Sequence, residues 1–161
     1  MVMKFLKSYR VDIEEFLRDT GYLPADLERE SLSDIKKVPV VSWTQAGSWR
    51  EMCNSLESGE YDEFVETAVN AVFALRVQGD SMETEFNEGD TIIINPYLKP
   101  DHNDYVVVSN EEGEATFKQL KKYGKMRILH PLNPKYDDIE LNKEIEYRII
   151  GVVLEKKKRY R

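Results

Sequence analysis

The pattern of apolar and polar positions predicts β-structure from about residue 38 onward. Short apolar or alternating runs recur there, and Gly, Asn, Asp or Pro closes most of them, as in strands separated by turns. The predicted strands span residues 71–77, 91–95, 104–109, 114–120, 126–130 and 147–154, after a first run that begins at Val38. We therefore expect a mainly β, mainly antiparallel domain.

Local turn sequences support this arrangement. Hairpin-like turns are expected at residues 87–90, 110–113 and 123–125, where Gly follows or separates polar residues. Residues 60–70 are less regular, because their apolar positions follow a 3.6-residue period over only two turns. A short helix or an irregular segment is expected there.

The patterning also suggests a division of the chain. Residues 1–24 carry apolar side chains at mixed helical spacing and end in Gly and Pro, which predicts a short helical segment. Residues 25–37 are polar and charged, as in a solvated linker. Residues 38–154 then form the β domain, and residues 155–161 form a basic tail.

Composition narrows the function classes. The 161 residues are 41% hydrophobic and carry a net charge of −7, so one main domain is expected and sequence-independent binding to nucleic acid by this chain is disfavoured. No apolar run reaches the roughly 18 residues of a membrane span and no signal peptide is apparent, so a cytoplasmic protein without membrane contact is expected. Cys53 is the only cysteine, which excludes an internal disulfide and a multi-cysteine zinc site. We assign no metal and no cofactor.

Two residues suggest the chemistry of a serine peptidase. Ser81 follows Gly79 and Asp80 at a turn between two apolar runs, and Lys118 lies in a strand-like segment. A serine hydroxyl becomes a nucleophile when a neighbouring base takes its proton, and a lysine can be that base once burial favours its neutral amine. An ordinary lysine has a pKa of about 10.4, so a neutral amine at pH 7 requires a shift of about 3 units.

The remaining parts of such a site are also present. Backbone N–H groups of Asp80, Ser81 and Met82 are candidates for an oxyanion hole. Upstream, Ala46 and Gly47 have small side chains that would let the backbone enter and bend in a narrow cleft. Nucleophile, base and substrate in one chain predict a protein that cuts itself.

Several motifs support a specific resemblance. The chain resembles the self-cleaving domain of LexA-type and phage CI-type repressors, the S24 peptidase family, over about residues 38–154. The matching motifs are VQGDSM at 77–82, EGDTIIINP at 88–96, DYVVV at 104–108, TFKQL at 116–120, PLNP at 131–134 and IIGVV at 149–153. Residues 38–49 are similar to the cleavage-site region of the phage-repressor branch.

The resemblance implies a fold like that of LexA and signal peptidase. It also implies that Ser81 attacks the carbonyl of Ala46, cutting the Ala46–Gly47 bond, with neutral Lys118 as the general base. In this family, RecA filaments formed after DNA damage stimulate cleavage in the SOS response, and the peptidase domain forms a homodimer. Operator DNA is bound through a helix-turn-helix head, of which only a remnant in residues 1–24 is expected in this chain.

Two other functions remain open at this point. Type I signal peptidase also uses a serine and a lysine, but the missing membrane anchor and the built-in Ala46–Gly47 bond count against it. The other is a headless dimerisation or partner-binding module of the same fold, which associates with a DNA polymerase. Such a role can coexist with self-cleavage.

Overall fold

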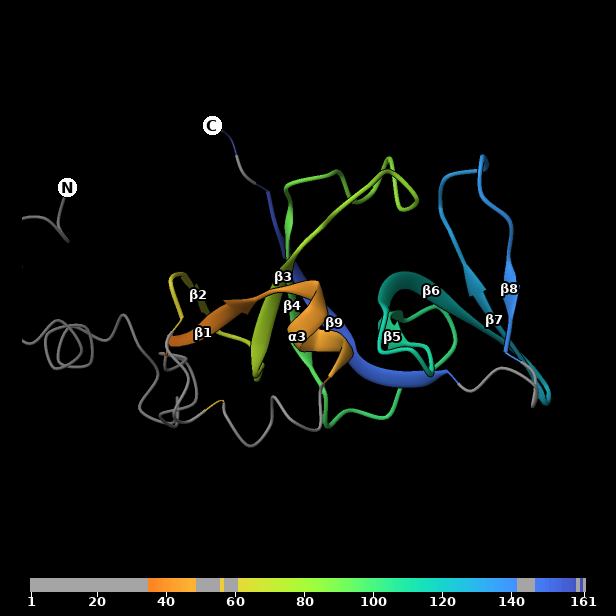
Figure 1. Cartoon of the computed structure of the whole chain (residues 1–161), viewed down its shortest axis with the longest axis horizontal. Helices are drawn as coiled ribbons and strands as arrows, with labels where there is room; N and C mark the ends of the chain where they lie inside the picture. Colours follow the sequence, from red (N-terminus) through yellow and green to blue (C-terminus); the bar gives the residue numbers. More distant parts are fainter. Residues whose placement is uncertain (1–34, 49–55, 57–60, 142–146, 159, 161) are drawn as a thin grey trace, which may run out of the picture. The chain divides into compact units, whose positions relative to one another are not determined.

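A computed structural model describes residues 35–48, 56, 61–141, 147–158 and 160. The predicted helical segment 1–24 and most of the predicted linker 25–37 lie outside the described residues. Residues 35–161 form one compact unit. Its described part is a nine-strand, mixed and largely antiparallel sheet with a single short helix (Figure 1), which confirms the expected mainly β fold.

The strands do not follow one another through the sheet in chain order. The elements are β1 (Lys36–Val41), α3 (Trp43–Gly47), β2 (Phe64–Thr67), β3 (Phe73–Arg76), β4 (Thr91–Asn95), β5 (Tyr105–Ser109), β6 (Ala115–Tyr123), β7 (Met126–His130), β8 (Ile139–Glu140) and β9 (Arg148–Lys157). The order in the sheet is β2-β1-β3-β4-β9-β5-β6-β7-β8. Among these described strands, only the β1–β3 pairing is parallel. The long strand β9 pairs with both β4 and β5 and so joins the two halves of the sheet.

All six predicted strands are present. Two of the predicted turns, 110–113 and 123–125, connect β5 to β6 and β6 to β7. Strand β9 is longer than expected and continues through Lys157, within the predicted basic tail. The expectation for residues 60–70 was wrong, because Phe64–Thr67 form strand β2 on the edge of β1. A 3.6-residue period over only two turns is a weak signal for a helix, and pairing with β1 determines the conformation of residues 64–67.

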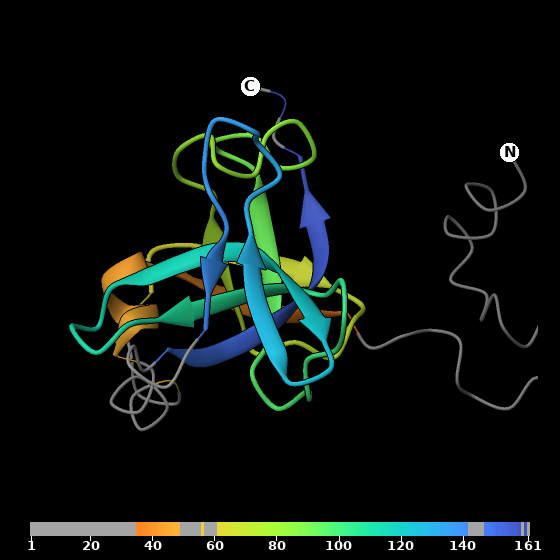
Figure 2. The same cartoon turned by 90° about the vertical axis from the view of Figure 1, so that its right-hand side faces the viewer.

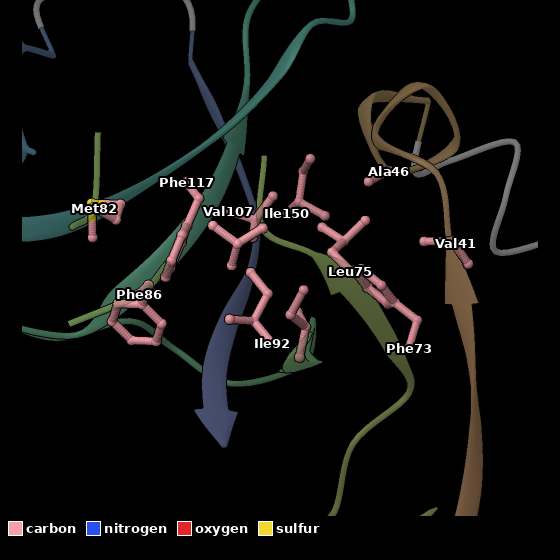
Figure 3. Packing of buried hydrophobic residues seen from close by; sticks show 12 residues of the cluster. Val41, Ala46, Phe73, Leu75, Met82, Phe86, Ile92, Val107, Phe117 and Ile150 are labelled. Atoms are coloured by element: carbon pink, nitrogen blue, oxygen red, sulfur yellow. The ribbon is translucent and has the colours of Figure 1, made fainter. Parts of the chain in front are cut away.

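The central strands are buried on both faces. All five residues of β4 are buried, and a strand covered on both sides reads as a continuous apolar run. Ile92 and Ile94 belong to one core cluster and Ile93 to another, as alternation along a strand requires. Figure 3 shows the larger cluster, with Met82, Phe86 and Phe117 at one end and Val41 and Ala46 at the other.

The short helix α3 depends on its surroundings. The Ser42 hydroxyl accepts a hydrogen bond from the Gln45 N–H, and the Gln45 side chain accepts one from the Ser42 N–H, which is a capping box. Five residues are too few for a helix that is stable by itself. Tertiary packing stabilises it: Ala46 is fully buried, and a Cβ on Gly47 would lie 1.7 Å from the carbonyl oxygen of Gly113 in the β5–β6 turn. Figure 2 shows α3 beside that turn.

The described residues contain no helix with the length and apolar character that crossing a membrane requires.

Close packing at β9 predicts that Gly151→Ala destabilises the sheet. A Cβ there would lie 2.6 Å from Cγ2 of Ile94 and 3.1 Å from the carbonyl oxygen of Asn95. Overpacking of this kind lowers the free energy of unfolding by about 1–3 kcal/mol, which urea denaturation will measure. Leu154→Ala, an exposed change on the same strand, is the control and should cost under about 0.5 kcal/mol. Equal losses in the two variants would contradict the packing argument.

Candidate active site

Ser81 lies in the loop that connects β3 to β4. The ends of this loop are held together, because the Val77 N–H donates to the Asp90 carbonyl at 2.8 Å and the Gly89 N–H donates to the Val77 carbonyl at 2.9 Å. Gly79 has φ +74°, a left-handed conformation that glycine adopts without a steric penalty. The chain therefore turns sharply just before Ser81.

The turn that carries Ser81 is anchored in the core. The Glu83 N–H donates to the Asp80 carbonyl at 3.1 Å, and the Phe86 N–H donates to the Met82 carbonyl at 2.9 Å. Met82 and Phe86 are buried. The Phe86 ring packs edge-on against the ring of Phe117, with centroids 4.8 Å apart. Since Phe117 precedes Lys118 on β6, this packing places the serine turn against the strand that carries the lysine.

The structure brings Ser81 and Lys118 together. The Lys118 side chain is buried, with 8% of its surface exposed. Its Nζ donates to Ser81 Oγ at 2.9 Å, to Thr116 Oγ1 at 3.1 Å and to the Phe117 carbonyl at 2.9 Å. The sequence analysis did not identify Thr116 or the Phe117 carbonyl as partners of Lys118. Thr116 could have been found, because it lies two residues before Lys118 in a strand and therefore on the same face.

These three partners suit both protonation states of the amine. A charged ammonium has three N–H donors and finds three acceptors. A neutral amine keeps two donors, for Thr116 and Phe117, and turns its lone pair toward Ser81, whose hydroxyl then donates. Loss of the proton therefore leaves no buried group unpaired.

Burial lowers the pKa of Lys118 below its ordinary value of 10.5. The cause is desolvation, which penalises the charged form of the amine. No carboxylate of the described residues lies within ion-pair distance of Lys118 to oppose this effect. The direction of the shift is the one that a general base requires.

The predicted oxyanion-hole donors make no hydrogen bonds within the described part of the chain. None of the N–H groups of Asp80, Ser81 and Met82 donates a hydrogen bond to another described residue. Free N–H groups beside a nucleophile can stabilise the negative oxygen that forms when a carbonyl is attacked.

A small pocket opens at Ser81. Its volume is about 200 Å³, below the roughly 300–1,000 Å³ of typical small-molecule sites. The lining residues come from α3, the serine loop and β6, and they are Trp43, Val77, Gln78, Ser81, Met82, Ala115, Thr116 and Phe117. A pocket of this size suits a peptide with small side chains better than a bulky ligand.

The predicted scissile bond is not presented to the serine in this conformation. Ala46 and Gly47 lie in α3, where the Ala46 N–H donates to the Ser42 carbonyl at 3.0 Å. Ala46 packs at the opposite end of the core cluster from Met82, the residue next to Ser81 (Figure 3). Only Trp43 of α3 lines the pocket. In this conformation neither Ala46 nor Gly47 lines the pocket at Ser81.

Most of the chain is similar to known proteins. The family model described as Peptidase S24-like matches residues 39–154. A transcriptional regulator of the helix-turn-helix type for the conjugative element R391 of Providencia rettgeri is 39% identical over 130 residues, which cover 74% of this chain and 60% of that protein. Repressor protein C2 of Salmonella phage P22 is 37% identical over 127 residues, 74% of this chain and 58% of that protein. The LexA repressor of Geobacter sp. (strain M21) is 33% identical over 119 residues, 73% of this chain and 59% of that protein. The chain thus spans about 60% of the length of these relatives.

The buried amine predicts a pH-dependent effect of Lys118→Met on stability. The unfolded chain keeps its proton up to about pH 10.5, whereas the folded chain releases it at lower pH because the pKa of Lys118 is lowered. Lysine therefore destabilises the fold below its folded-state pKa, and the penalty shrinks as the pH rises toward 10.5. The stability advantage of the Lys118→Met variant over the chain with lysine should therefore decrease as the pH rises from 7 to about 10.5.

Thermal unfolding at pH 7 and at about pH 10.5 will measure this difference. The lysine and methionine chains both carry Ser81→Ala, which prevents reaction at Ser81. The hydrogen bonds lost with the amine shift both measurements together, so the change with pH isolates desolvation. A difference that is the same at the two pH values would contradict burial as the cause.

Proposed function

The chain belongs to the Peptidase S24-like family and is homologous to the C-terminal domains of LexA and phage repressors, and from this premise we propose that it is a self-cleaving regulatory domain of a transcriptional repressor. Ser81 is the nucleophile, Lys118 is the general base, and the Ala46–Gly47 bond is the substrate. The observation that carries the proposal is the 2.9 Å contact between a buried lysine amine and the hydroxyl of Ser81.

The reaction follows from this contact. Neutral Lys118 takes the proton of Ser81 while Oγ bonds to the carbonyl carbon of Ala46, and the N–H groups of Ser81 and Met82 stabilise the oxyanion. Collapse breaks the bond to the Gly47 nitrogen, which receives the proton from Lys118. Water, deprotonated by Lys118, then hydrolyses the ester between Ser81 and Ala46. No cofactor is required.

The wider context is part of the same proposal. The relatives are named as helix-turn-helix regulators and repressors, so this domain would act in a longer protein whose head binds operator DNA. RecA filaments are the proposed stimulus of cleavage, and a homodimer formed through this domain is the proposed assembly. Cleavage would separate the head from the dimerising domain and so release the operator.

Self-cleavage should be first order and should accelerate with pH. Because only the neutral amine is a base and the pKa of Lys118 is lowered from 10.5, the rate rises as the pH approaches that pKa and is constant above it. Intact-mass spectrometry after incubation from pH 7 to about pH 10 should show fragments 1–46 and 47–161.

Ser81→Ala is the control and should remain whole. A rate that is constant between pH 7 and 10 would contradict Lys118 as the titrating base. A parent chain that stays uncut, even with RecA, nucleotide and single-stranded DNA, would favour the partner-binding module instead.

The capping box of α3 predicts a variant that cuts faster. Ser42→Ala removes the hydroxyl that accepts from the Gln45 N–H at 3.2 Å, and loss of such a cap costs about 1 kcal/mol of helix stability. If unwinding of α3 precedes attack, the unwound population and the cleavage rate should both rise about 5-fold.

Thr44→Ala is the matched control. It lies on the same helix outside the capping box, and alanine is the better helix former, so this variant should cut no faster than the parent. Equal acceleration by both variants would indicate an effect of side-chain bulk near the bond rather than of helix stability.

A further inference from the structure

Asn133 holds the serine turn from a distant part of the chain. It lies between β7 and β8, and its side chain is buried, with 6% exposed. Its Nδ2 donates to the Asp80 carbonyl at 2.9 Å across 53 residues of sequence, and its backbone N–H donates to the Ser81 carbonyl at 3.0 Å. One residue therefore binds two successive carbonyl groups beside the nucleophile.

These two carbonyl groups control where two N–H groups point. In a planar trans peptide unit the C=O and N–H bonds point in opposite directions. The Asp80 carbonyl shares its unit with the Ser81 N–H, and the Ser81 carbonyl shares its unit with the Met82 N–H. Asn133 holds the Asp80 carbonyl together with the Glu83 N–H, and it holds the Ser81 carbonyl through its own N–H. It thereby directs the Ser81 and Met82 N–H groups away from itself, and neither donates to another described residue.

We propose that Asn133 is the positioning residue of the oxyanion hole, orienting the Ser81 and Met82 N–H groups through the carbonyls of their own peptide units. The inference rests on the proposed self-cleavage and adds a residue to its machinery. Asn133 does not touch the substrate. It acts on the orientation of donors that must be in place before the oxyanion forms.

The Asn133 amide is itself oriented by its neighbours. Its Oδ1 accepts from the Lys135 N–H at 3.1 Å, which leaves Nδ2 to face Asp80. Its backbone carbonyl accepts from the Tyr136 N–H at 3.1 Å, and the Tyr136 hydroxyl donates to the Asp80 carboxylate. Segment 133–136 thus contacts the serine turn through side chains and backbone together.

The test is Asn133→Ala, for which the chain offers a matched control. Asn95 is also buried, its Nδ2 donates to the Asn70 carbonyl at 2.6 Å, and its Oδ1 accepts from the Tyr97 N–H two residues later at 2.8 Å. Asn95→Ala therefore removes the same side-chain groups from a buried position that is not part of the serine turn. Asn133→Leu is a second variant that keeps the branched shape of the side chain and removes the same side-chain hydrogen bonds.

Two rates are compared across pH for the full chain. The first is self-cleavage. The second is labelling of Ser81 by a fluorophosphonate, in which Oγ bonds to phosphorus, fluoride leaves and Lys118 takes the proton, so that Ala46–Gly47 is not needed. Removing a single oxyanion-hole donor lowers rates by about 10²–10³-fold, and we expect misorientation to lower the high-pH plateau of both reactions by about 10- to 100-fold.

The pH midpoint distinguishes positioning from loosening of the fold. The midpoint reports the pKa of Lys118, which depends on its burial, so a positioning role lowers the plateau and leaves the midpoint unchanged. Asn95→Ala should keep both the plateau and the midpoint of the parent.

Each other outcome overturns a specific claim. A parent that cuts, with Asn133→Ala at the same plateau, overturns this inference alone. Loss of folded structure in both Asn133 variants, with Asn95→Ala folded, assigns Asn133 to the fold and also overturns it. A parent that neither cuts nor becomes labelled overturns the proposed function, and this inference with it.

Discussion

The burial of one lysine amine is the constraint on which the rest of the site depends. Lys118 lies buried on β6, and no described carboxylate pairs with it. A buried ammonium is costly, so the site supplies three hydrogen-bond acceptors that also suit the neutral form. These acceptors reduce the cost of the charged amine, and they also leave the neutral amine fully hydrogen-bonded. On the proposed function, a base next to Ser81 requires that neutral form.

Ser81 is positioned by contacts from several directions. Met82 and Phe86 bury one side of the turn in the core, and Asn133 binds its backbone from a segment 53 residues away. Lys118 approaches from β6. Three separate segments thus meet at Ser81, and the sheet is what brings them together. On the proposed function this placement matters, because oxyanion-hole donors act only when they already point at the developing charge.

Sequence predicted the strands well because their signal is local. Continuous apolar runs such as residues 91–95 identify buried strands, and the serine and lysine were suggested by their motifs. Helix α3 was missed, although Ser42 and Gln45 have the spacing of a capping box, because the apolar residues before them suggested a continuing strand. The role of Asn133 could not be predicted, because its contacts with Asp80 and Ser81 arise only from the folded topology.

On the proposed function, the conformation of α3 determines when the bond can be cut. Attack within one chain does not depend on protein concentration. At a given pH the rate therefore scales with the fraction of chains in which Ala46 has left its buried position. Trp43 belongs to α3 and also lines the pocket at Ser81. Unwinding the helix therefore frees the substrate and reshapes one wall of its binding site in the same motion. A stimulus that stabilises the unwound segment would change both at once, without any change in Ser81, Lys118 or the donors around them.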